Sequence, residues 1–261
     1  MIFRLALGLE YDGSGFCGWQ RQDHAPSVQE ALEKALSRVA DEPVTVTCAG
    51  RTDTGVHATE QVVHFETAAY RPEHAWVLGA NSNLPGGVAV RWARPVDDTF
   101  HARFGATSRS YRYIWCCGRA RPALLRGRVA WSKYPLDASL MAKAAGALLG
   151  EHDFSAFRAV ACQAKHPVRT VRALTVQAAG PFIYLDITAN AFLHHMVRNI
   201  AGTLSLIGRQ ERPVAWTAEL LAGRDRTVAG ATAPAEGLYL VGVEYPEVHG
   251  LPLQGWRPRF A

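Results

Sequence analysis

The stretch Ala49-Gly50-Arg51-Thr52-Asp53-Thr54-Gly55-Val56-His57-Ala58 separates two apolar runs, residues 44–49 and 61–65, that are typical of strands. Its two glycines allow a tight turn with a close backbone approach. The stretch also places a carboxylate, Asp53, between two hydroxyls and two residues after Arg51. Such a loop can hold an ionised Asp against a substrate. It can equally be a hairpin turn whose Asp caps its own backbone, with Arg51 as a surface charge. These residues alone leave both interpretations open.

The elements on either side of this loop predict the order β-α-β-β-α-β, and that order recurs after residue 104. Ser27 and Glu30 form a capping box at the start of a helix over 27–41, whose apolar residues repeat at helical spacing. The other predicted strands are 2–11, 88–95, 108–117, 169–178, 182–189 and 238–245, and the other predicted helices are 72–84, 137–149, 195–207 and 213–222. We therefore predict an α+β protein with two ferredoxin-like halves, residues 1–104 and 105–261, whose antiparallel sheets meet at a central catalytic cleft.

Composition points to a basic globular protein, which suits an anionic partner. The chain has 261 residues, 48% of them hydrophobic, with a formal net charge of +5 and a pI of about 9.1. A basic excess fits a nucleic-acid partner, because phosphate contacts supply much of the affinity for nucleic acids. The five cysteines contain no C-x-x-C pair, and no apolar run is long enough to cross a bilayer, so we expect reduced thiols, a cytoplasmic location and no membrane association. Cys162 and His166 lack a second pair of ligands, so we expect no metal.

Two segments of the second half could carry chemistry. In a strand over 108–117, Arg109, Tyr111 and Tyr113 share one face, which suits phosphate contact and base stacking, while Arg112 points away. The alternative is a half-buried aromatic strand with arginines at its edge. Arg198 lies between the most apolar positions of the predicted helix 195–207, and a buried arginine there would need a carboxylate such as Asp53. The alternative is an arginine in solvent.

Two further polar segments are less specific. The segment 150–158 places two acids beside a histidine and reads either as a functional loop or as a solvated connector. His194 and His195 are adjacent and would not share a helical face, which argues against a metal pair.

Six blocks in order resemble the tRNA pseudouridine synthase I family of the pseudouridine synthase superfamily. They span residues 11 to about 245: Tyr11-Asp12-Gly13 with Gly18-Trp19-Gln20, the Asp53 loop, 100–113, 150–157, His195-Met196-Val197-Arg198-Asn199, and Ala233-Pro234-Ala235-Glu236-Gly237-Leu238-Tyr239-Leu240. The arginine-rich segment 119–128 and residues 208–212 depart from the family pattern.

The resemblance implies the conversion of uridine to pseudouridine at positions 38, 39 and 40 in the anticodon arm of tRNA. It implies a homodimer that needs neither metal nor organic cofactor. Within it, Asp53 matches the catalytic aspartate, Arg198 the basic residue that pairs with it, and Tyr111 the tyrosine that stacks on the target base. Leu238 matches an apolar wall of the pocket, and Arg51 an arginine proposed to act in flipping the nucleotide. We also expect Arg103 and Arg109 to contact the RNA.

Other functions fit parts of the same pattern. A non-catalytic RNA-binding protein would explain the charge and the aromatic strand, but a carboxylate facing phosphates would not help mere binding. A glycosidase usually needs two acids at a set separation, and the motifs supply only Asp53 clearly. A pseudouridine synthase that acts at other RNA sites is the nearest alternative.

Overall fold

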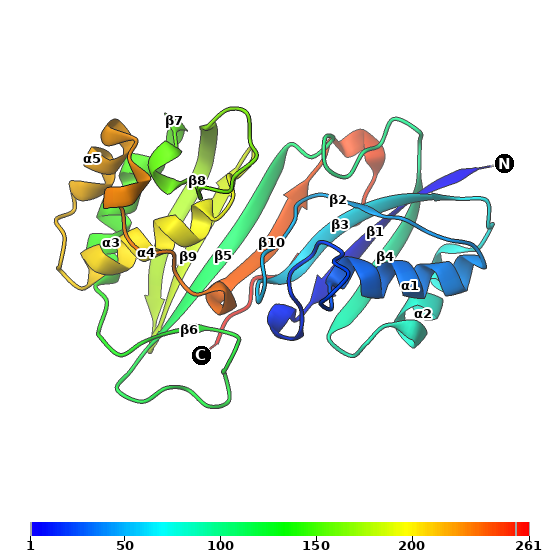
Figure 1. Ribbon diagram of the computed structural model, residues 1–261, viewed down its shortest axis with the longest axis horizontal. Coiled ribbons are helices and arrows are strands. Elements are labelled where there is room, and N and C mark those ends of the chain that lie inside the picture. The colour runs from blue at the N-terminus through cyan, green and yellow to red at the C-terminus, as the bar shows by residue number, and fades with distance from the viewer. Residues whose placement is uncertain (1, 254, 261) are drawn as a thin grey trace. The chain divides into compact units, whose positions relative to one another are not determined.

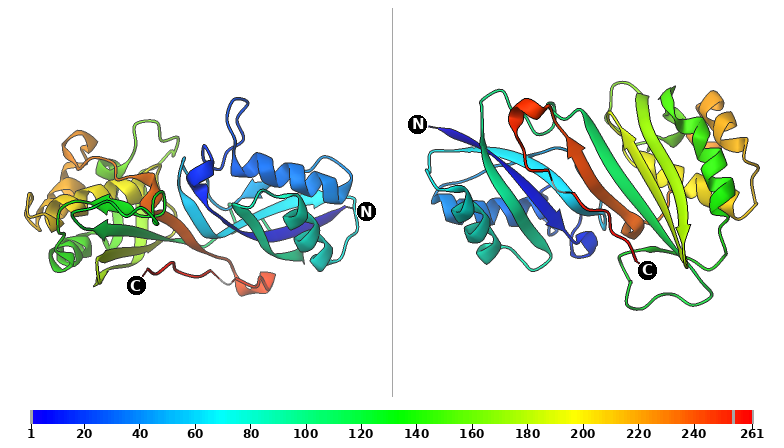
Figure 2. Two further views of the ribbon diagram at one scale, coloured as in Figure 1. Left: turned by 90° about the horizontal axis from the view of Figure 1, so that it is seen from below. Right: turned by 180° about the vertical axis from the view of Figure 1, so that it is seen from behind.

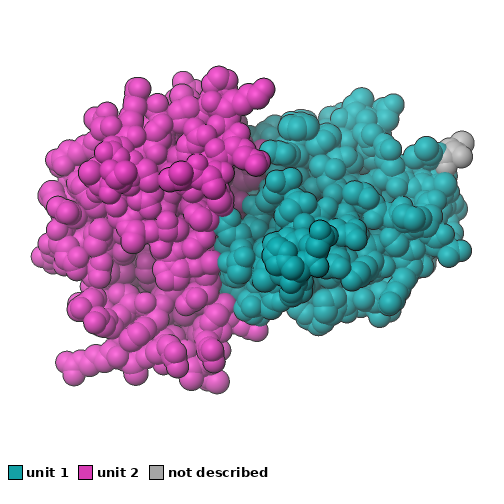
Figure 3. Space-filling model, viewed as in Figure 1, with its two compact units in different colours: residues 1–107, 239–257 teal, residues 108–238, 258–261 magenta. Residues whose placement is uncertain are grey.

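The computed structural model describes residues 2–253 and 255–260 of the chain. By its internal contacts the chain divides into two units, coloured separately in Figure 3. Unit 1 consists of Met1–Thr107 and Tyr239–Arg257, and unit 2 consists of Ser108–Leu238 and Pro258–Ala261. Helices and strands are mixed in both units and the strands pair mostly antiparallel, so the chain is an α+β protein.

Unit 1 is a sheet with two helices (Figure 1). Its elements are β1 (Phe3–Tyr11), α1 (Val28–Ala40), β2 (Thr47–Cys48), β3 (His57–Thr67), α2 (Glu73–Asn83), β4 (Val88–Val96) and β10 (Leu238–Glu244), whose first residue is assigned to unit 2. The strand order is β4-β1-β3-β10, with β2 also paired to β3. All of these pairs are antiparallel except that of β3 with β10. Helix α1 packs beside α2, and α2 packs against β4.

The predicted helix over 27–41 is confirmed because its signals are local. The Ser27 side chain accepts a hydrogen bond from the backbone N–H of Glu30, and α1 starts at the next residue. Its apolar face buries Leu32 and Leu36 completely, and the β1 residues Leu7 and Leu9 are also buried. Full burial of one such side chain contributes about 1.5–3 kcal/mol to the free energy of folding, compared with leaving it exposed.

The two predicted strands around Asp53 differ in length from the expectation. The first was predicted over 44–49, but only Thr47–Cys48 pairs, because side chains of α1 occupy the preceding backbone donors. Glu33 accepts from the N–H of Val46, and Ser37 accepts from that of Val44. The second was predicted over 61–65, but β3 starts at His57 and is 11 residues long. The loop that carries Asp53 is therefore shorter than the sequence suggested.

Unit 2 combines further strands with three α-helices. Its elements are β5 (Ser108–Cys117), β6 (Ala130–Ser132), α3 (Ala138–Ala145), β7 (Gly150–Asp153), β8 (Val168–Ala179), β9 (Phe182–Ala189), α4 (Met196–Gly208) and α5 (Trp216–Gly223). The strand order is β5-β9-β8-β7, with β6 paired parallel to β5. Strands β8 and β9 run side by side as the predicted hairpin (Figure 2). Helix α3 packs against β8, α4 and α5.

Three local predictions in unit 2 have clear outcomes. Asp137 caps α3 as expected, because its carboxylate accepts from the N–H groups of Ser139 and Leu140. The segment 150–158 was interpreted as a functional loop or a solvated connector. This was wrong for its first four residues, because 150–153 form β7, which lies at the edge of the sheet and pairs with β8. Helix α4 begins at Met196 rather than at His195, since His195 has a left-handed φ of 60°.

Among the described residues, no helix is long and apolar enough to cross a membrane.

Candidate active site

The loop between β2 and β3 holds Asp53 half-buried while fixing the residues on either side of it. Thr52 is buried, and its hydroxyl is 2.8 Å from the phenol oxygen of Tyr11, at the end of β1. The Thr52 carbonyl accepts from the backbone N–H of Trp19 at 2.9 Å, and the Asp53 carbonyl accepts from that of Val56 at 3.1 Å. The backbone that carries the carboxylate is therefore held by contacts with a strand and with a separate loop.

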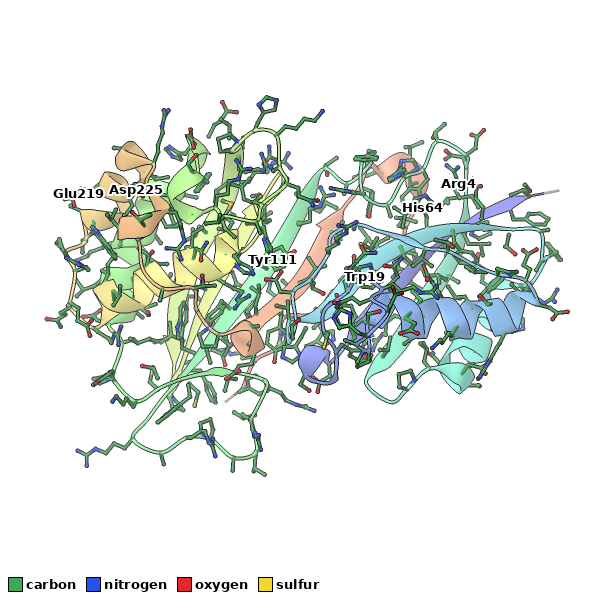
Figure 4. All side chains as sticks on the ribbon, in the orientation of Figure 1. Arg4, Trp19, His64, Tyr111, Glu219 and Asp225 are labelled. Atoms are coloured by element: carbon green, nitrogen blue, oxygen red, sulfur yellow. The ribbon has the colours of Figure 1, made fainter. Side chains whose placement is uncertain are left out.

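A buried amide from β3 ties the start of the same loop. The side chain of Gln61, which has no exposed surface, donates to the carbonyl of Gly50 at 2.6 Å. On the other side of the loop, Gly18 has a φ of +89°, and a Cβ there would lie 2.9 Å from the Thr52 carbonyl oxygen. Only glycine permits both that backbone conformation and that approach. The Trp19 side chain, labelled in Figure 4, is also fully buried in this unit. These contacts fix the backbone on both sides of Asp53.

Arg51 and Arg103 are positively charged residues of unit 1 that both act electrostatically on Cys48. Both side chains are exposed. Burial raises the pKa of the Cys48 thiol to about 12, while the positive charges of Arg51 and Arg103 act on it in the opposite direction. Both guanidinium groups therefore lie within electrostatic range of Cys48, close to the Asp53 loop in the chain. Arg103 also lies over the ring of Phe104, at 5.5 Å from the centroid.

Strand β5 presents its residues on two faces as the sequence predicted. Tyr111 is half-buried, and its ring meets that of Phe192 edge to face with centroids 5.0 Å apart. Arg109 donates to the Asn190 carbonyl at 3.2 Å. Arg112 makes a bidentate ion pair with Asp186 at 2.7 and 2.8 Å. Because side chains alternate along the strand, Arg112, which pairs with Asp186, and Tyr111 point to opposite faces.

Tyr113 does not join Tyr111 as a stacking surface, so the prediction that both rings are offered to RNA was wrong for this residue. Its ring is completely buried and its hydroxyl donates to the Pro234 carbonyl at 2.9 Å. Burial raises the pKa of the phenol far above its usual range, and the nearby positive charge of Arg198 opposes that shift only in part. Tyr113 therefore serves the packing of unit 2.

Arg198, on α4, is half-buried and makes two hydrogen bonds with one residue of a distant segment. Its Nε donates to the carbonyl of Ala233 at 2.9 Å, and the N–H of Ala233 donates to the Arg198 carbonyl at 3.1 Å. The predicted carboxylate partner, Asp53, belongs to unit 1, so the pairing stays a prediction. Leu238 is buried and starts β10, directly after the 3-10 turn Ala235–Gly237.

A polar cluster beside Arg198 was missed by the sequence analysis. The amide of Asn199, fully buried, donates to the Phe157 carbonyl at 2.8 Å and accepts from the Thr232 hydroxyl at 2.6 Å and from Arg226 at 3.1 Å. These four residues hold the strap, residues 229–234, on α4. The only signal in the sequence was the position of Asn199 next to Arg198, since the other partners are remote in the chain.

The strap crosses α4 at a glycine. A Cβ at Gly202 would lie 1.8 Å from the carbonyl oxygen of Ala231, which is closer than real atoms approach. The absence of a side chain at this position lets the strap reach Arg198.

The two adjacent histidines do not belong to α4. Their rings lie together, with centroids 4.0 Å apart, because the left-handed backbone at His195 turns the chain just before the helix. The helical-face argument against a joint role for them therefore does not apply.

The residues predicted to act together are divided between the units. Asp53, Arg51 and Arg103 belong to unit 1, and Tyr111, Arg109, Arg198 and Leu238 belong to unit 2. Each unit supplies two arginines, which suit a polyanionic substrate. They accompany a half-buried acid, Asp53, in unit 1 and a half-buried aromatic ring, Tyr111, in unit 2.

Comparison with known proteins defines the class of protein. The family profile described as tRNA pseudouridine synthase matches residues 9–105 and 144–246, and pseudouridine synthases are isomerases. The chain belongs to the tRNA pseudouridine synthase family.

Particular relatives cover the whole chain. A protein named tRNA pseudouridine synthase A from Escherichia coli (strain K12 / DH10B) is 58% identical over 259 residues, which is 99% of this chain and 96% of the relative. The protein of the same name from Shigella boydii serotype 18 gives the same values. Among solved structures, a crystal structure of a Cbf5-Nop10-Gar1 complex matches with a TM-score of 0.34 and 11% identity, over 89% of this chain and 47% of that one. That likeness is too low to support an argument.

Proposed function

We propose that this protein converts uridine to pseudouridine in the anticodon arm of tRNA, at positions 38, 39 and 40, with Asp53 as the catalytic residue. The observation that carries the proposal is a half-exposed carboxylate on a loop whose neighbours are fixed by Tyr11, Trp19 and Gln61. The family and the relatives named tRNA pseudouridine synthase A support the choice of substrate.

The reaction explains why one acid is enough. The N1–C1′ bond of uridine breaks, the uracil turns, and a C5–C1′ bond forms, while C5 loses its proton and N1 gains one. No group enters or leaves apart from protons. A carboxylate suits this isomerisation because it can attack the sugar or the base, or take a sugar proton, and is then released again.

The other predicted residues would hold the nucleotide while it rearranges. The target base must first leave its stack, which costs a few kcal/mol. In this proposal Arg51 assists that extrusion and Tyr111 stacks on the flipped base. Leu238 forms an apolar wall, and Arg198 pairs with the Asp53 carboxylate through its opposite charge. Arg103 and Arg109 contact the RNA backbone.

The proposal includes the organisation of the molecule. In unit 1 the elements β1-α1-β2-β3-α2-β4 with the strand order β4-β1-β3-β2 support a ferredoxin-like half. We further propose a second ferredoxin-like half, an active-site cleft between the halves (1–104 and 105–261), and a cytoplasmic homodimer that works without metal or cofactor.

A C5-tritium release assay tests the function directly, because formation of the C5–C1′ bond displaces the label from C5. Wild-type protein should release tritium from C5-labelled uridine in tRNA, and mapping the modified sites should find positions 38 to 40. Asp53→Asn should abolish release while tRNA binding persists. Asp98→Asn, a change to an exposed acid of the same unit, is the matched control and should retain activity. Normal turnover by Asp53→Asn would remove Asp53 from the catalytic role, and modification at other positions would favour a different RNA site.

A further inference from the structure

The connection from β5 through β6 to α3 contains an unusual concentration of positive charge. We call residues 118–134 the arginine loop. It contains Arg119, Arg121, Arg126, Arg128 and Lys133, and no acidic residue. The whole chain has 28 basic and 23 acidic residues. Without the five bases of the arginine loop, the rest of the chain would carry 23 of each. The arginine loop therefore accounts for the entire net charge of the protein.

The charged side chains of the arginine loop are at the surface. All four arginines and Lys133 are exposed, and Leu124 between them is 96% exposed. The next acid in the chain, Asp137, is occupied in capping α3. Figures 1 and 2 show the arginine loop as a long excursion from the end of β5. A concentration of exposed cations in a segment that contains no acidic residue is suited to a polyanion.

The arginine loop is anchored at both ends. Cys116 and Trp131 are register partners where β5 pairs with β6. The N–H of Gly118 donates to the Ser132 carbonyl at 3.0 Å, and the Trp131 indole donates to the Gly118 carbonyl at 2.8 Å. Within the loop the N–H of Arg126 donates to the Ala123 carbonyl at 3.3 Å, which closes a turn. An anchored loop loses less conformational entropy on binding than a flexible tail.

Exposed aromatic rings lie beside these charges. Trp131 is 38% exposed and Tyr134 is 45% exposed. The Lys133 ammonium lies 4.9 Å from the centre of the Tyr134 ring, and the Arg209 guanidinium lies 5.5 Å from it. Basic groups together with accessible rings are the combination that binds the backbone and bases of RNA.

Arg119 and Arg121, at the start of the arginine loop, lie beyond the end of β5 that is remote from Tyr111. Tyr111, labelled in Figure 4, is on β5, and the strand continues for six residues to Cys117 before the arginine loop starts. At about 3.3 Å per residue this is roughly 20 Å. An RNA whose target base stacks on Tyr111 would meet Arg119 and Arg121 only with a different part of its chain.

We propose that the arginine loop is a second RNA-binding site, which grips the phosphate backbone of the tRNA substrate at a distance from the target uridine. This inference rests on the proposed function for the identity of the RNA. Because Arg119 and Arg121 lie away from a base stacked on Tyr111, their contacts act equally on bound substrate and transition state. They therefore lower KM without changing kcat.

The test compares two triple variants that remove the same charge. Arg119→Gln/Arg121→Gln/Arg126→Gln neutralises the arginine loop, and Arg71→Gln/Arg94→Gln/Arg212→Gln neutralises three exposed arginines elsewhere. With full-length tRNA, the loop variant should raise KM by about tenfold and leave kcat within about twofold of wild type. The slope of log affinity against log salt should become shallower by roughly two to three units, since each phosphate contact contributes about 0.7–0.9. The control variant should change both quantities much less.

Further measurements separate the possible outcomes. Arg119→Lys/Arg121→Lys/Arg126→Lys should restore most of the affinity, and a melting temperature equal to wild type should show that the fold is intact. Equal effects of the two triple variants would mean general charge steering and would overturn the proposal. A change of oligomeric state by light scattering, with tRNA affinity intact, would assign the arginine loop to a protein contact and would also overturn it. If wild-type protein binds tRNA but forms no pseudouridine, the proposed function fails, while the salt dependence of binding still tests the arginine loop.

Discussion

Gly202→Ala should weaken both the fold of unit 2 and the placement of Arg198. A Cβ at position 202 would lie 1.8 Å from the carbonyl oxygen of Ala231, whereas real Cβ contacts are essentially never shorter than 3.0 Å. The strap on α4 must therefore move by at least 1.2 Å. The atom in the way is backbone, so no side-chain rotation can relieve the contact.

The size of the effect follows from two separate consequences. Forcing one extra methyl group into a packed site costs about 1–3 kcal/mol. At about 2–4 °C per kcal/mol for a protein of this size, the melting temperature should fall by roughly 2–12 °C. The bond from Arg198 Nε to the Ala233 carbonyl is 2.9 Å, and the same displacement carried along the strap would stretch it beyond hydrogen-bonding distance. A misplacement of about 1 Å can reduce turnover by up to about 10²-fold.

The assay combines thermal unfolding with tritium release, and Gly223→Ala is the control. Gly223 ends α5, and a Cβ there would meet nothing within 4 Å. The control should be neutral or slightly stabilising, because alanine is favoured over glycine in a helix. A Gly202→Ala protein with wild-type melting temperature and turnover would refute the close approach of the strap. A lower melting temperature with unchanged kcat would refute only the link to Arg198.

Two further predictions concern single side chains. Tyr111→Phe should keep the ring contact with Phe192 and the affinity for tRNA but lose any proton transfer by the hydroxyl. Tritium release should therefore drop while the melting temperature stays constant. Full activity would leave stacking as the only role of Tyr111. His64 is buried, which lowers its pKa to about 4, with the charges of His101 and Arg4 acting in the same direction (Figure 4). Its Nδ1 accepts from the N–H of Ala102 and must be unprotonated to do so. Because the unfolded chain binds this proton near pH 6.5, stability should be complete above that pH and fall as the pH is lowered toward 4. Melting temperatures measured against pH should show a shallower decline for His64→Gln than for wild type, and parallel curves would contradict this assignment.

The sequence alone determined the features that depend on near neighbours in the chain. The helix capped by Ser27, the α3 cap at Asp137 and the hairpin of β8 and β9 follow from spacing, caps and turn residues. The separation of Arg112 from Tyr111 follows from strand alternation. The family was also readable from its six blocks, since these motifs are contiguous in the chain.

Only the tertiary structure decided which polar groups support the functional residues. The short β2 results from donors occupied by Glu33 and Ser37, and the burial of Tyr113 results from the remote Pro234. The strap on Arg198 depends on a glycine and an asparagine of α4 that meet residues about thirty positions later. Periodicity and turn chemistry report the preferences of adjacent residues, whereas these contacts join segments that the chain brings together only when the core is packed.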